Sequence, residues 1–185
     1  MPSGPGMIPE SLIANIAARV PPPVATFLLT SEINPQKIIA QQRRCGTNTL
    51  QLVDHLPCSA HDQIREALPG IKLVQVVHVE NEESVKYAVS VADHVDALLL
   101  DSGTLSGSVK EFGGTGRTHD WNLSRQIRDG VPIPVFLAGG LNSANVAKAI
   151  EAVEPFGIDL CSSVRTNHLL DIEKLETFFK AIPNP

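Results

Sequence analysis

The sequence predicts an α/β fold built on a parallel β-sheet, and two observations support this. Short apolar or β-branched runs alternate with helical patterns along all 185 residues of the chain. The spacing between successive runs leaves room for a helix, and right-handed crossovers of this kind join parallel strands. On this pattern we count about six β/α units. An open doubly wound sheet and a (β/α)8 barrel both fit it.

The first half of the chain contains a lone helix followed by three β/α units. The expected strands are residues 24–29, 49–53 and 71–79. The expected helices are residues 9–20, a helix opened by Asn34 and Pro35, residues 59–68, and a helix with Val85, Ala88, Val89 and Ala92 facing inward. Asn34 is a good capping residue and Pro35 suits a first helical turn. Pro69 and Gly70 end the following helix.

The second half continues the same alternation. The expected strands are residues 95–100, 134–138 and 158–162. The expected helices are residues 120–128, a helix with Val146, Ala149, Ile150 and Val153 facing inward, and a helix with Leu175, Phe178, Phe179 and Ile182. No linker or low-complexity segment divides the chain. Residues 1–185 are therefore expected to form a single domain.

Composition and charge indicate a protein that handles a small molecule. The formal net charge of −5 and the pI near 5.6 give no basic surface for nucleic acid or for an anionic membrane. The N-terminus lacks the pattern of a signal peptide and no apolar run is long enough to cross a bilayer, so a cytoplasmic protein is expected. Cys45, Cys58 and Cys161 lack disulfide or metal-ligand spacing. No metal site and no cofactor are predicted.

Two glycine clusters and one aspartate form the candidate site. The clusters are residues 113–116 and 138–141, each beside a short apolar run, and Asp101 ends another such run. Backbone without Cβ can approach a phosphate closely, and its bare N–H groups bind it well. Alternatively, the glycines only permit tight turns, and Asp101 only caps a helix or solubilises a loop. We interpret the three segments together as a divided phosphate site with a carboxylate for proton chemistry.

Four segments resemble a known family in their order and spacing. They are Leu98-Leu99-Leu100-Asp101-Ser102, Gly113-Gly114-Thr115-Gly116-Arg117-Thr118-His119-Asp120-Trp121, Pro134-Val135-Phe136-Leu137-Ala138-Gly139-Gly140-Leu141-Asn142 and Glu154-Pro155-Phe156-Gly157-Ile158-Asp159. They are similar to segments of phosphoribosylanthranilate isomerases, which are (β/α)8-barrel enzymes of tryptophan biosynthesis. The likeness is clearest from about Asp96 to Phe179 and weaker back to about Pro9.

The resemblance implies a TIM-type (β/α)8 barrel that lacks its first two strands and first helix, with about six β/α units present. The chain would begin inside the loop after the second strand of the family, so we expect the polypeptide to start further upstream. Such a barrel leaves the edges of strands 24–29 and 158–162 unpaired. We therefore expect homodimerisation or aggregation through these edges.

The implied reaction is the Amadori rearrangement of N-(5-phosphoribosyl)anthranilate, a small phosphorylated sugar, to a 1-deoxyribulose 5-phosphate product. The general acid of the family matches Asp101. The residues implied in phosphate binding are Gly114, Gly116, Gly139 and Gly140, with Ser162 and Ser163 nearby. Asp159 matches a family aspartate near the aminoaryl part of the substrate, although an aspartate at a strand end is as often structural.

The chain also departs from the family pattern. The general base of the family is a cysteine on the first strand, and the chain contains neither that strand nor its motif. Loss of a general base costs about 10²–10⁴ in rate. Cys161 is an alternative base, although a small buried thiol without a catalytic role is far commoner. The alternative function is therefore a catalytically impaired paralogue that binds a sugar phosphate or acts on another phosphorylated substrate.

Further departures concern the substrate-binding loops. A family arginine that holds the anthranilate carboxylate would fall in residues 3–6, which contain no arginine. The family has a glycine, a valine and a glutamate where this chain has Ser163, Val164 and Arg165. A serine thus replaces the glycine, and Arg165 reverses the charge of the glutamate. His119 lies in the loop of the first glycine cluster, residues 113–116, and is the one histidine placed near the candidate site. Trp121 is expected to pack between a helix and the sheet.

Overall fold

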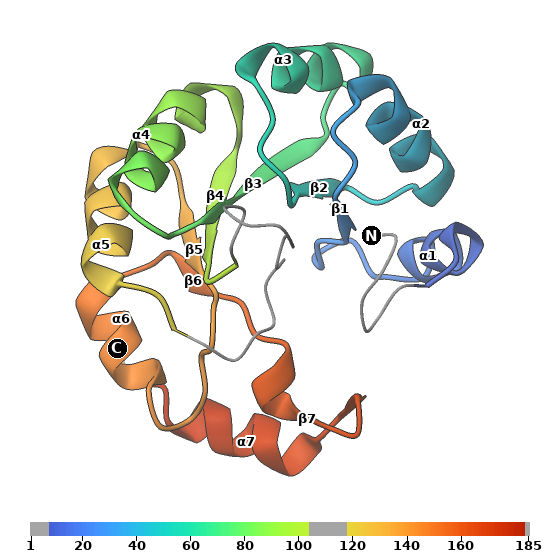
Figure 1. Cartoon of the computed structure of the whole chain (residues 1–185). Coiled ribbons are helices and arrows are strands. Elements are labelled where there is room, and N and C mark those ends of the chain that lie inside the picture. The colour runs from blue at the N-terminus through green and yellow to red at the C-terminus, as the bar shows by residue number, and fades with distance from the viewer. Residues whose placement is uncertain (1–7, 104–117, 184–185) are drawn as a thin grey trace. The chain divides into compact units, whose positions relative to one another are not determined.

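The computed structural model describes residues 8–103 and 118–183. The helices are α1 (Glu10–Ala17), α2 (Pro35–Cys45), α3 (Cys58–Ala67), α4 (Glu82–Val91), α5 (Trp121–Gly130), α6 (Val146–Val153) and α7 (Ile172–Lys180) (Figure 1). The strands are β1 (Phe27–Thr30), β2 (Thr49–Leu52), β3 (Lys72–His78), β4 (Ala97–Asp101), β5 (Val135–Leu137), β6 (Gly157–Ile158), β7 (Arg165–Thr166) and β8 (Leu169–Leu170). Short 3-10 turns occupy Ala92–His94 and Ser162–Val164.

The predicted α/β fold with a parallel sheet is confirmed. The strands of the main sheet follow the chain order from β1 to β6, and every printed pairing between them is parallel. β1 and β6 therefore occupy the two ends of the strand order. On β1, Phe27 and Leu29 are exposed while Leu28 and Thr30 are buried, the alternation of a strand with one covered face.

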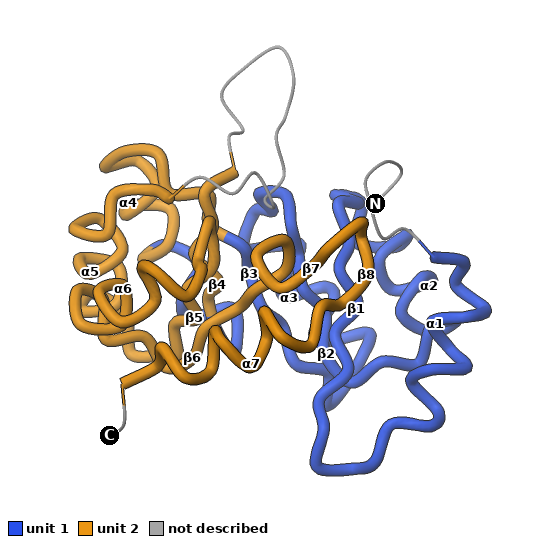
Figure 2. The backbone as a smooth tube through the Cα atoms, turned by 90° about the horizontal axis from the view of Figure 1, so that it is seen from below, with its two compact units in different colours: residues 1–76, 90–97 blue, residues 77–89, 98–185 orange. Residues whose placement is uncertain are grey.

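Two compact units make up the chain (Figure 2). Unit 1 consists of Met1–Val76 and Ser90–Ala97, and unit 2 of Val77–Val89 and Leu98–Pro185. Unit 1 contains β1, β2 and most of β3. Unit 2 contains β5, β6 and all of β4 after its first residue. That residues 1–185 behave as one domain stays a prediction.

Local sequence explains where α2 begins and ends in unit 1. The Oδ1 atom of Asn34 accepts hydrogen bonds from the backbone N–H groups of Gln36 (3.0 Å) and Lys37 (3.3 Å). Gly46 ends the helix in the left-handed conformation, with a φ of 66°, which glycine adopts without a Cβ clash. The predicted cap at Asn34 is therefore confirmed, and the helix lies with Ile38 and Ile39 fully buried.

The core of unit 2 is built from β4, β5 and the inner faces of α5 and α6. Leu98, Leu100 and Leu137 are buried on the strands. Ile127 and Val146 are buried on the helices, which lie against each other. Packing of this kind fixes the ends of β4 and β5, and these ends carry the candidate site residues.

Four predictions about individual segments are wrong. Residues 24–26 precede β1 instead of belonging to it, and the expected strand 158–162 ends at Ile158. Val89 and Phe179 were expected to face inward but are 49% and 62% exposed. Helical periodicity locates the centre of an apolar face but not its edges, and both residues lie beyond the buried stripe.

A buried polar pair joins α3 to β3 within unit 1. The amide nitrogen of Gln75 donates to the backbone carbonyls of Leu52 (3.0 Å), Asp54 (2.9 Å) and Val76 (3.0 Å). Its Oε1 atom is therefore the acceptor in the 2.8 Å contact with Nε2 of His61, so His61 carries its proton on Nε2. Burial is the main cause that lowers the pKa of His61. Its Nδ1 atom is buried with no partner among the described residues.

This buried imidazole predicts a loss of stability in acid. The unfolded chain takes up a proton near the ordinary pKa of about 6.5, whereas the folded chain resists it. As the pH falls below that value, each further pH unit lowers the free energy of unfolding by up to about 1.4 kcal/mol, until His61 is protonated in the folded state. Urea unfolding between pH 8 and 5 measures this slope. His61→Leu should flatten it and His168→Asn, at an exposed site, should not; an equal slope in all three proteins would contradict the prediction.

Candidate active site

Three neighbouring strands of unit 2 end at the same level. Register pairs Leu100 with Leu137, and Leu137 with Ile158. Beyond these pairs, the N–H of Ala138 donates to the carbonyl of Leu100 (2.7 Å), and the N–H of Asp159 donates to the carbonyl of Leu137 (2.9 Å). The carboxyl ends of β4, β5 and β6 thus present Asp101, Gly139–Gly140 and Asp159 side by side. This is the edge of a parallel α/β sheet at which ligands bind.

Asp101 is the last residue of β4 and is half-buried. Its Oδ1 atom accepts a 2.7 Å hydrogen bond from the N–H of Ser102, which fixes the carboxyl group against its own turn. Its backbone carbonyl accepts from the N–H of Val79 (2.9 Å). The structure therefore places Asp101 at a strand end, as the sequence predicts.

The Gly139–Gly140 turn after β5 requires glycine at its first position. Gly139 has a φ of +81°, and a Cβ added there would lie 2.9 Å from the backbone nitrogen of Ser102 and 3.0 Å from Nδ1 of His119. Gly140 has a φ of 63°, and its carbonyl accepts from the side-chain amides of Asn142 (3.2 Å) and Asn145 (3.0 Å). The turn is thus held tightly against the residues that follow β4.

His119 packs against this turn in its neutral form. Its Nε2 atom lies 2.7 Å from the hydroxyl of Ser124 on α5, while Nδ1 is buried with no partner among the described residues. Burial lowers the pKa of His119 to about 4, against the opposing effect of the nearby carboxylates of Asp101 and Asp120. Sequence reasoning placed His119 near the site but gave it no role.

Asp159 follows β6 and faces the same edge. Part of the residue is exposed to solvent, while neighbouring protein atoms surround its carboxyl group. Desolvation by the surrounding protein is the main cause that raises the pKa of Asp159 to about 6, and the negative charge of Asp101 is the second. The hydrogen bond from the N–H of Leu160 lowers the pKa. Asp101 and Asp159 therefore lie close enough for one carboxylate to influence the proton affinity of the other.

The segment after Asp159 carries the two predicted serines. Ser162 and Ser163 lie in the 3-10 turn Ser162–Val164. Ser162 is exposed, whereas the hydroxyl of Ser163 is buried with no hydrogen-bond partner among the described residues. Cys161, which the sequence suggested at the end of a strand, lies outside β6 and is exposed. A buried hydroxyl without a partner is a donor available to a ligand.

Other predicted residues take no part in the described site. Gly114 and Gly116 lie outside the described residues. Trp121 is the first residue of α5 and is half-buried, and its Nε1 atom has no partner in the described part of the chain. Cys45 is buried at the end of α2 and Cys58 begins α3, both in unit 1.

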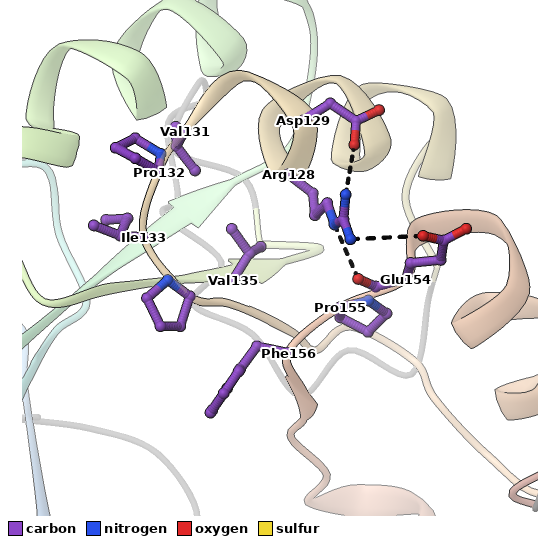
Figure 3. Close-up of a pocket in the computed structure, with 10 residues that line it drawn as sticks. Arg128, Asp129, Val131, Pro132, Ile133, Val135, Glu154, Pro155 and Phe156 are labelled. Atoms are coloured by element: carbon purple, nitrogen blue, oxygen red, sulfur yellow. Dashed lines mark hydrogen bonds and ion pairs between the residues drawn. The ribbon is translucent and has the colours of Figure 1, made fainter. Parts of the chain in front are cut away.

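A recess of about 470 Å³ opens at the other end of β5 and β6 (Figure 3). Its lining residues are Arg128, Asp129, Val131, Pro132, Ile133, Pro134, Val135, Glu154, Pro155 and Phe156. Arg128 donates to the carbonyl of Glu154 (3.1 Å) and to the carboxylate of Asp129 (2.9 Å), so its guanidinium is occupied by the protein itself. Because Pro134 and Phe156 precede their strands, the recess lies at the amino ends of the strands, away from Asp101.

Residues 8–103 and 118–183 contain neither a metal-binding cluster nor a membrane-spanning helix. No three His, Cys, Asp or Glu side chains in these ranges gather as a metal-binding group. No helix in the same ranges has the length and apolar character needed to cross a membrane.

The chain is similar to one family of enzymes along most of its length. The family model described as N-(5′-phosphoribosyl)anthranilate (PRA) isomerase matches residues 16–181. The N-(5′-phosphoribosyl)anthranilate isomerase of Methanocella arvoryzae is 36% identical over 149 residues, which cover 80% of this chain and 68% of that protein.

Solved structures show the same likeness. The phosphoribosyl anthranilate isomerase of Thermotoga maritima matches with a TM-score of 0.80 and 28% identity, over 97% of this chain and 83% of that one. A phosphoribosyl anthranilate isomerase in complex with reduced 1-(o-carboxyphenylamino)-1-deoxyribulose 5-phosphate matches with a TM-score of 0.77 and 25% identity, over 97% and 82% of the two chains. A third match, also with a TM-score of 0.77 and 25% identity over 98% and 82%, is to monomers generated from the dimeric Thermotoga enzyme.

Proposed function

The chain belongs to the N-(5′-phosphoribosyl)anthranilate isomerase family, and from this premise we propose that it isomerises N-(5′-phosphoribosyl)anthranilate to 1-(o-carboxyphenylamino)-1-deoxyribulose 5-phosphate in tryptophan biosynthesis. The main support is that Asp101 and the Gly139–Gly140 turn lie side by side at the carboxyl ends of β4 and β5. The family model matches residues 16–181, which include both. The TIM-barrel likeness supports it, because barrel enzymes carry their active sites at the carboxyl ends of the strands.

In the proposed reaction Asp101 is the general acid. Its protonated carboxyl group donates to the ring oxygen of the phosphoribosyl group, the bond from that oxygen to C1′ breaks, and an iminium ion forms between C1′ and the anthranilate nitrogen. A base then removes the proton from C2′, and tautomerisation gives the 2′-ketone. A carboxyl group at a strand end, fixed by the N–H of Ser102, supports this role because proton transfer requires a positioned donor.

We propose that the phosphate is held by backbone N–H groups of Gly139 and Gly140, with the hydroxyls of Ser162 and Ser163 beside them. The left-handed turn at Gly139 and the unpartnered hydroxyl of Ser163 support this assignment. Gly114 and Gly116 complete the proposed phosphate site. Asp159 contacts the remainder of the substrate, and no cofactor takes part.

Location and assembly complete the proposal. A biosynthetic enzyme of this family acts in the cytoplasm, and we propose that location here. We also propose self-association through the edges of β1 and β6, because both are terminal in the strand order and Phe27 and Leu29 are exposed. Light scattering at several protein concentrations tests this, and a monomer at all of them contradicts it.

The activity is tested with the purified chain and freshly generated N-(5′-phosphoribosyl)anthranilate. Chromatography should show conversion to the deoxyribulose product, and the gene should restore growth without tryptophan to a strain that lacks this isomerase. Calorimetry with the reduced product named above provides a second readout. Tight binding of that compound without turnover would instead favour the impaired paralogue that binds a sugar phosphate.

A further inference from the structure

The proposed reaction needs its acid and its phosphate site at a fixed spacing, because a displacement of about 1 Å can cost about 10²-fold in rate. This inference rests on the proposed isomerase function and concerns the residue that keeps this spacing. Asp101 ends β4, and the Gly139–Gly140 turn follows β5. The 2.7 Å bond from the N–H of Ala138 to the carbonyl of Leu100 joins the two strand ends just before these residues. Beyond that bond, the turn depends on the atoms packed against it.

Two residues pack against the same face of Gly139. The position that a Cβ on Gly139 would take lies 2.9 Å from the backbone nitrogen of Ser102, 3.0 Å from its Cβ and 3.0 Å from Nδ1 of His119. These distances are shorter than an ordinary contact of about 3.5–4.0 Å, so the bare Cα of a glycine is needed here. Ser102 directly follows the acid, and its N–H donates to Oδ1 of Asp101 (2.7 Å). The imidazole ring thus lies where the turn after β5 meets the turn after β4.

The imidazole of His119 is itself fixed to α5. Its Nε2 atom lies 2.7 Å from the hydroxyl of Ser124, and Ser124 is fully buried on that helix. Ile127 on the same helix is also buried, and α5 lies against α6. Side chains anchored on packed helices hold their positions more precisely than side chains on loops. A continuous chain of contacts therefore runs from α5 through the ring to Gly139 and Ser102.

The ring makes these contacts without a charge. Burial is the main cause that lowers the pKa of His119 to about 4, against the opposing effect of the carboxylates of Asp101 and Asp120. The ring is therefore neutral at pH 7, and its Nδ1 atom, buried with no partner among the described residues, faces Gly139. A neutral ring places no positive charge beside an acid that must carry a proton. These properties suit a supporting role, which needs shape and a fixed orientation but no proton transfer.

We propose that His119 is a positioning residue of the isomerase site, where it holds the Gly139–Gly140 turn at a fixed place relative to Asp101. The ring fills the space on one face of Gly139, and its bond to Ser124 sets the orientation of the ring. A phosphate group bound by the turn then anchors the substrate so that its ring oxygen stays within reach of the carboxyl group of Asp101. His119 itself touches no reacting atom.

The test compares His119→Ala and His119→Phe with the unaltered chain. His119→Ala should lower kcat by about 10–100-fold, because the turn still binds phosphate but no longer holds it in place. The dissociation constant of the reduced product should change by less than about fivefold, since no group that contacts the ligand is removed. His119→Phe keeps a ring of similar size against Gly139, so it should recover most of the lost turnover although the bond to Ser124 is gone.

The matched control removes a second buried histidine, in unit 1. The Nε2 contact of His61 with Gln75 is 2.8 Å long, close to the 2.7 Å contact of His119 with Ser124. His61→Ala should lower the unfolding temperature and leave kcat unchanged. Kinetics are measured well below the unfolding temperature of each variant, so that a loss of folded protein cannot imitate a loss of positioning.

Amide hydrogen exchange, followed by NMR, provides a readout that does not need turnover. The N–H groups of Ser102 and Ala138 donate to Asp101 and to Leu100, on either side of the contact with His119. Both should exchange about tenfold faster in His119→Ala, because loss of the ring lowers the free energy of local opening. In His119→Phe and His61→Ala they should exchange as in the unaltered chain.

The outcomes separate the inference from the function on which it rests. An active chain in which His119→Ala leaves kcat unchanged overturns the inference alone, as does an equal fall of kcat in His119→Phe or in His61→Ala. A folded chain that binds the reduced product without turnover overturns the proposed function, and the exchange rates then decide the inference. Faster exchange confined to His119→Ala keeps His119 as the support of the turn, whereas equal rates in all variants overturn that role as well.

Discussion

Asp101→Asn should abolish most of the isomerase activity while leaving the fold unchanged. We expect kcat to fall by about 10²–10⁴-fold, because the amide cannot donate an acidic proton to the ring oxygen. Its oxygen can still accept the 2.7 Å hydrogen bond from the N–H of Ser102, so the turn after β4 remains in place. Steady-state kinetics and thermal unfolding of the same preparation measure both effects.

Asp96→Asn is the matched control for this experiment. Asp96 accepts from the N–H of Leu73 (2.9 Å) and forms ion pairs with Lys72 (3.0 Å) and Arg65 (3.1 Å), all within unit 1. Its replacement should lower the unfolding temperature but not kcat. A second readout concerns Asp159, because its carboxyl titration should move below pH 6 once the charge of Asp101 is gone. An Asp101→Asn protein with full turnover would contradict the assignment of the acid.

Gly139→Ala should destabilise the protein and lower its affinity for the phosphate group of the ligand. The left-handed backbone at a φ of +81° costs a residue with a side chain about 1–3 kcal/mol. The new methyl group would also lie 2.9 Å from a backbone nitrogen, that of Ser102, which cannot rotate aside. With about 2–4 °C lost per kcal/mol in a protein of this size, thermal unfolding should detect the change readily.

Gly70→Ala separates the two causes. Gly70 has a similar φ of +86°, but nothing lies within 4 Å of an added Cβ. This variant should therefore show only the backbone effect, and the additional loss in Gly139→Ala measures the contact with Ser102. The affinity for the reduced product should fall in Gly139→Ala alone. Equal losses of stability in the two variants, with unchanged affinity in both, would show that the close contact at Gly139 has no consequence.

The sequence predicted the main sheet well because each strand is a short apolar run bounded by polar or turn residues. The same feature placed Asp101 and Gly139 at strand ends, since the apolar run stops there. The requirement for glycine at 139 was inferred from its chemistry and is explained by the backbone of Ser102. The roles of these residues stay predictions.

Other features could not be read from local patterns. The β7–β8 hairpin has strands of two residues each, too short to show any periodicity, so the local pattern does not predict it. The contact of His119 with Gly139 and Ser124, and the effect of Asp101 on Asp159, join residues that are distant in the chain. Such pairings depend on packing, which composition and spacing do not encode.

The division of the chain into two units affects how it folds during synthesis. The chain leaves unit 1 within β3, returns to it at Ser90, and leaves again after Ala97. Residues 77–89 therefore emerge from the ribosome before unit 1 is complete, although they belong to unit 2. Neither unit is a continuous segment: the last residues of unit 1 are made after residues 77–89, and most of unit 2 is made after Ala97. Ending the chain after Val76 or Val89 would remove Ser90–Ala97 from unit 1 and residues from unit 2, whereas ending it after Ala97 would remove residues from unit 2 alone.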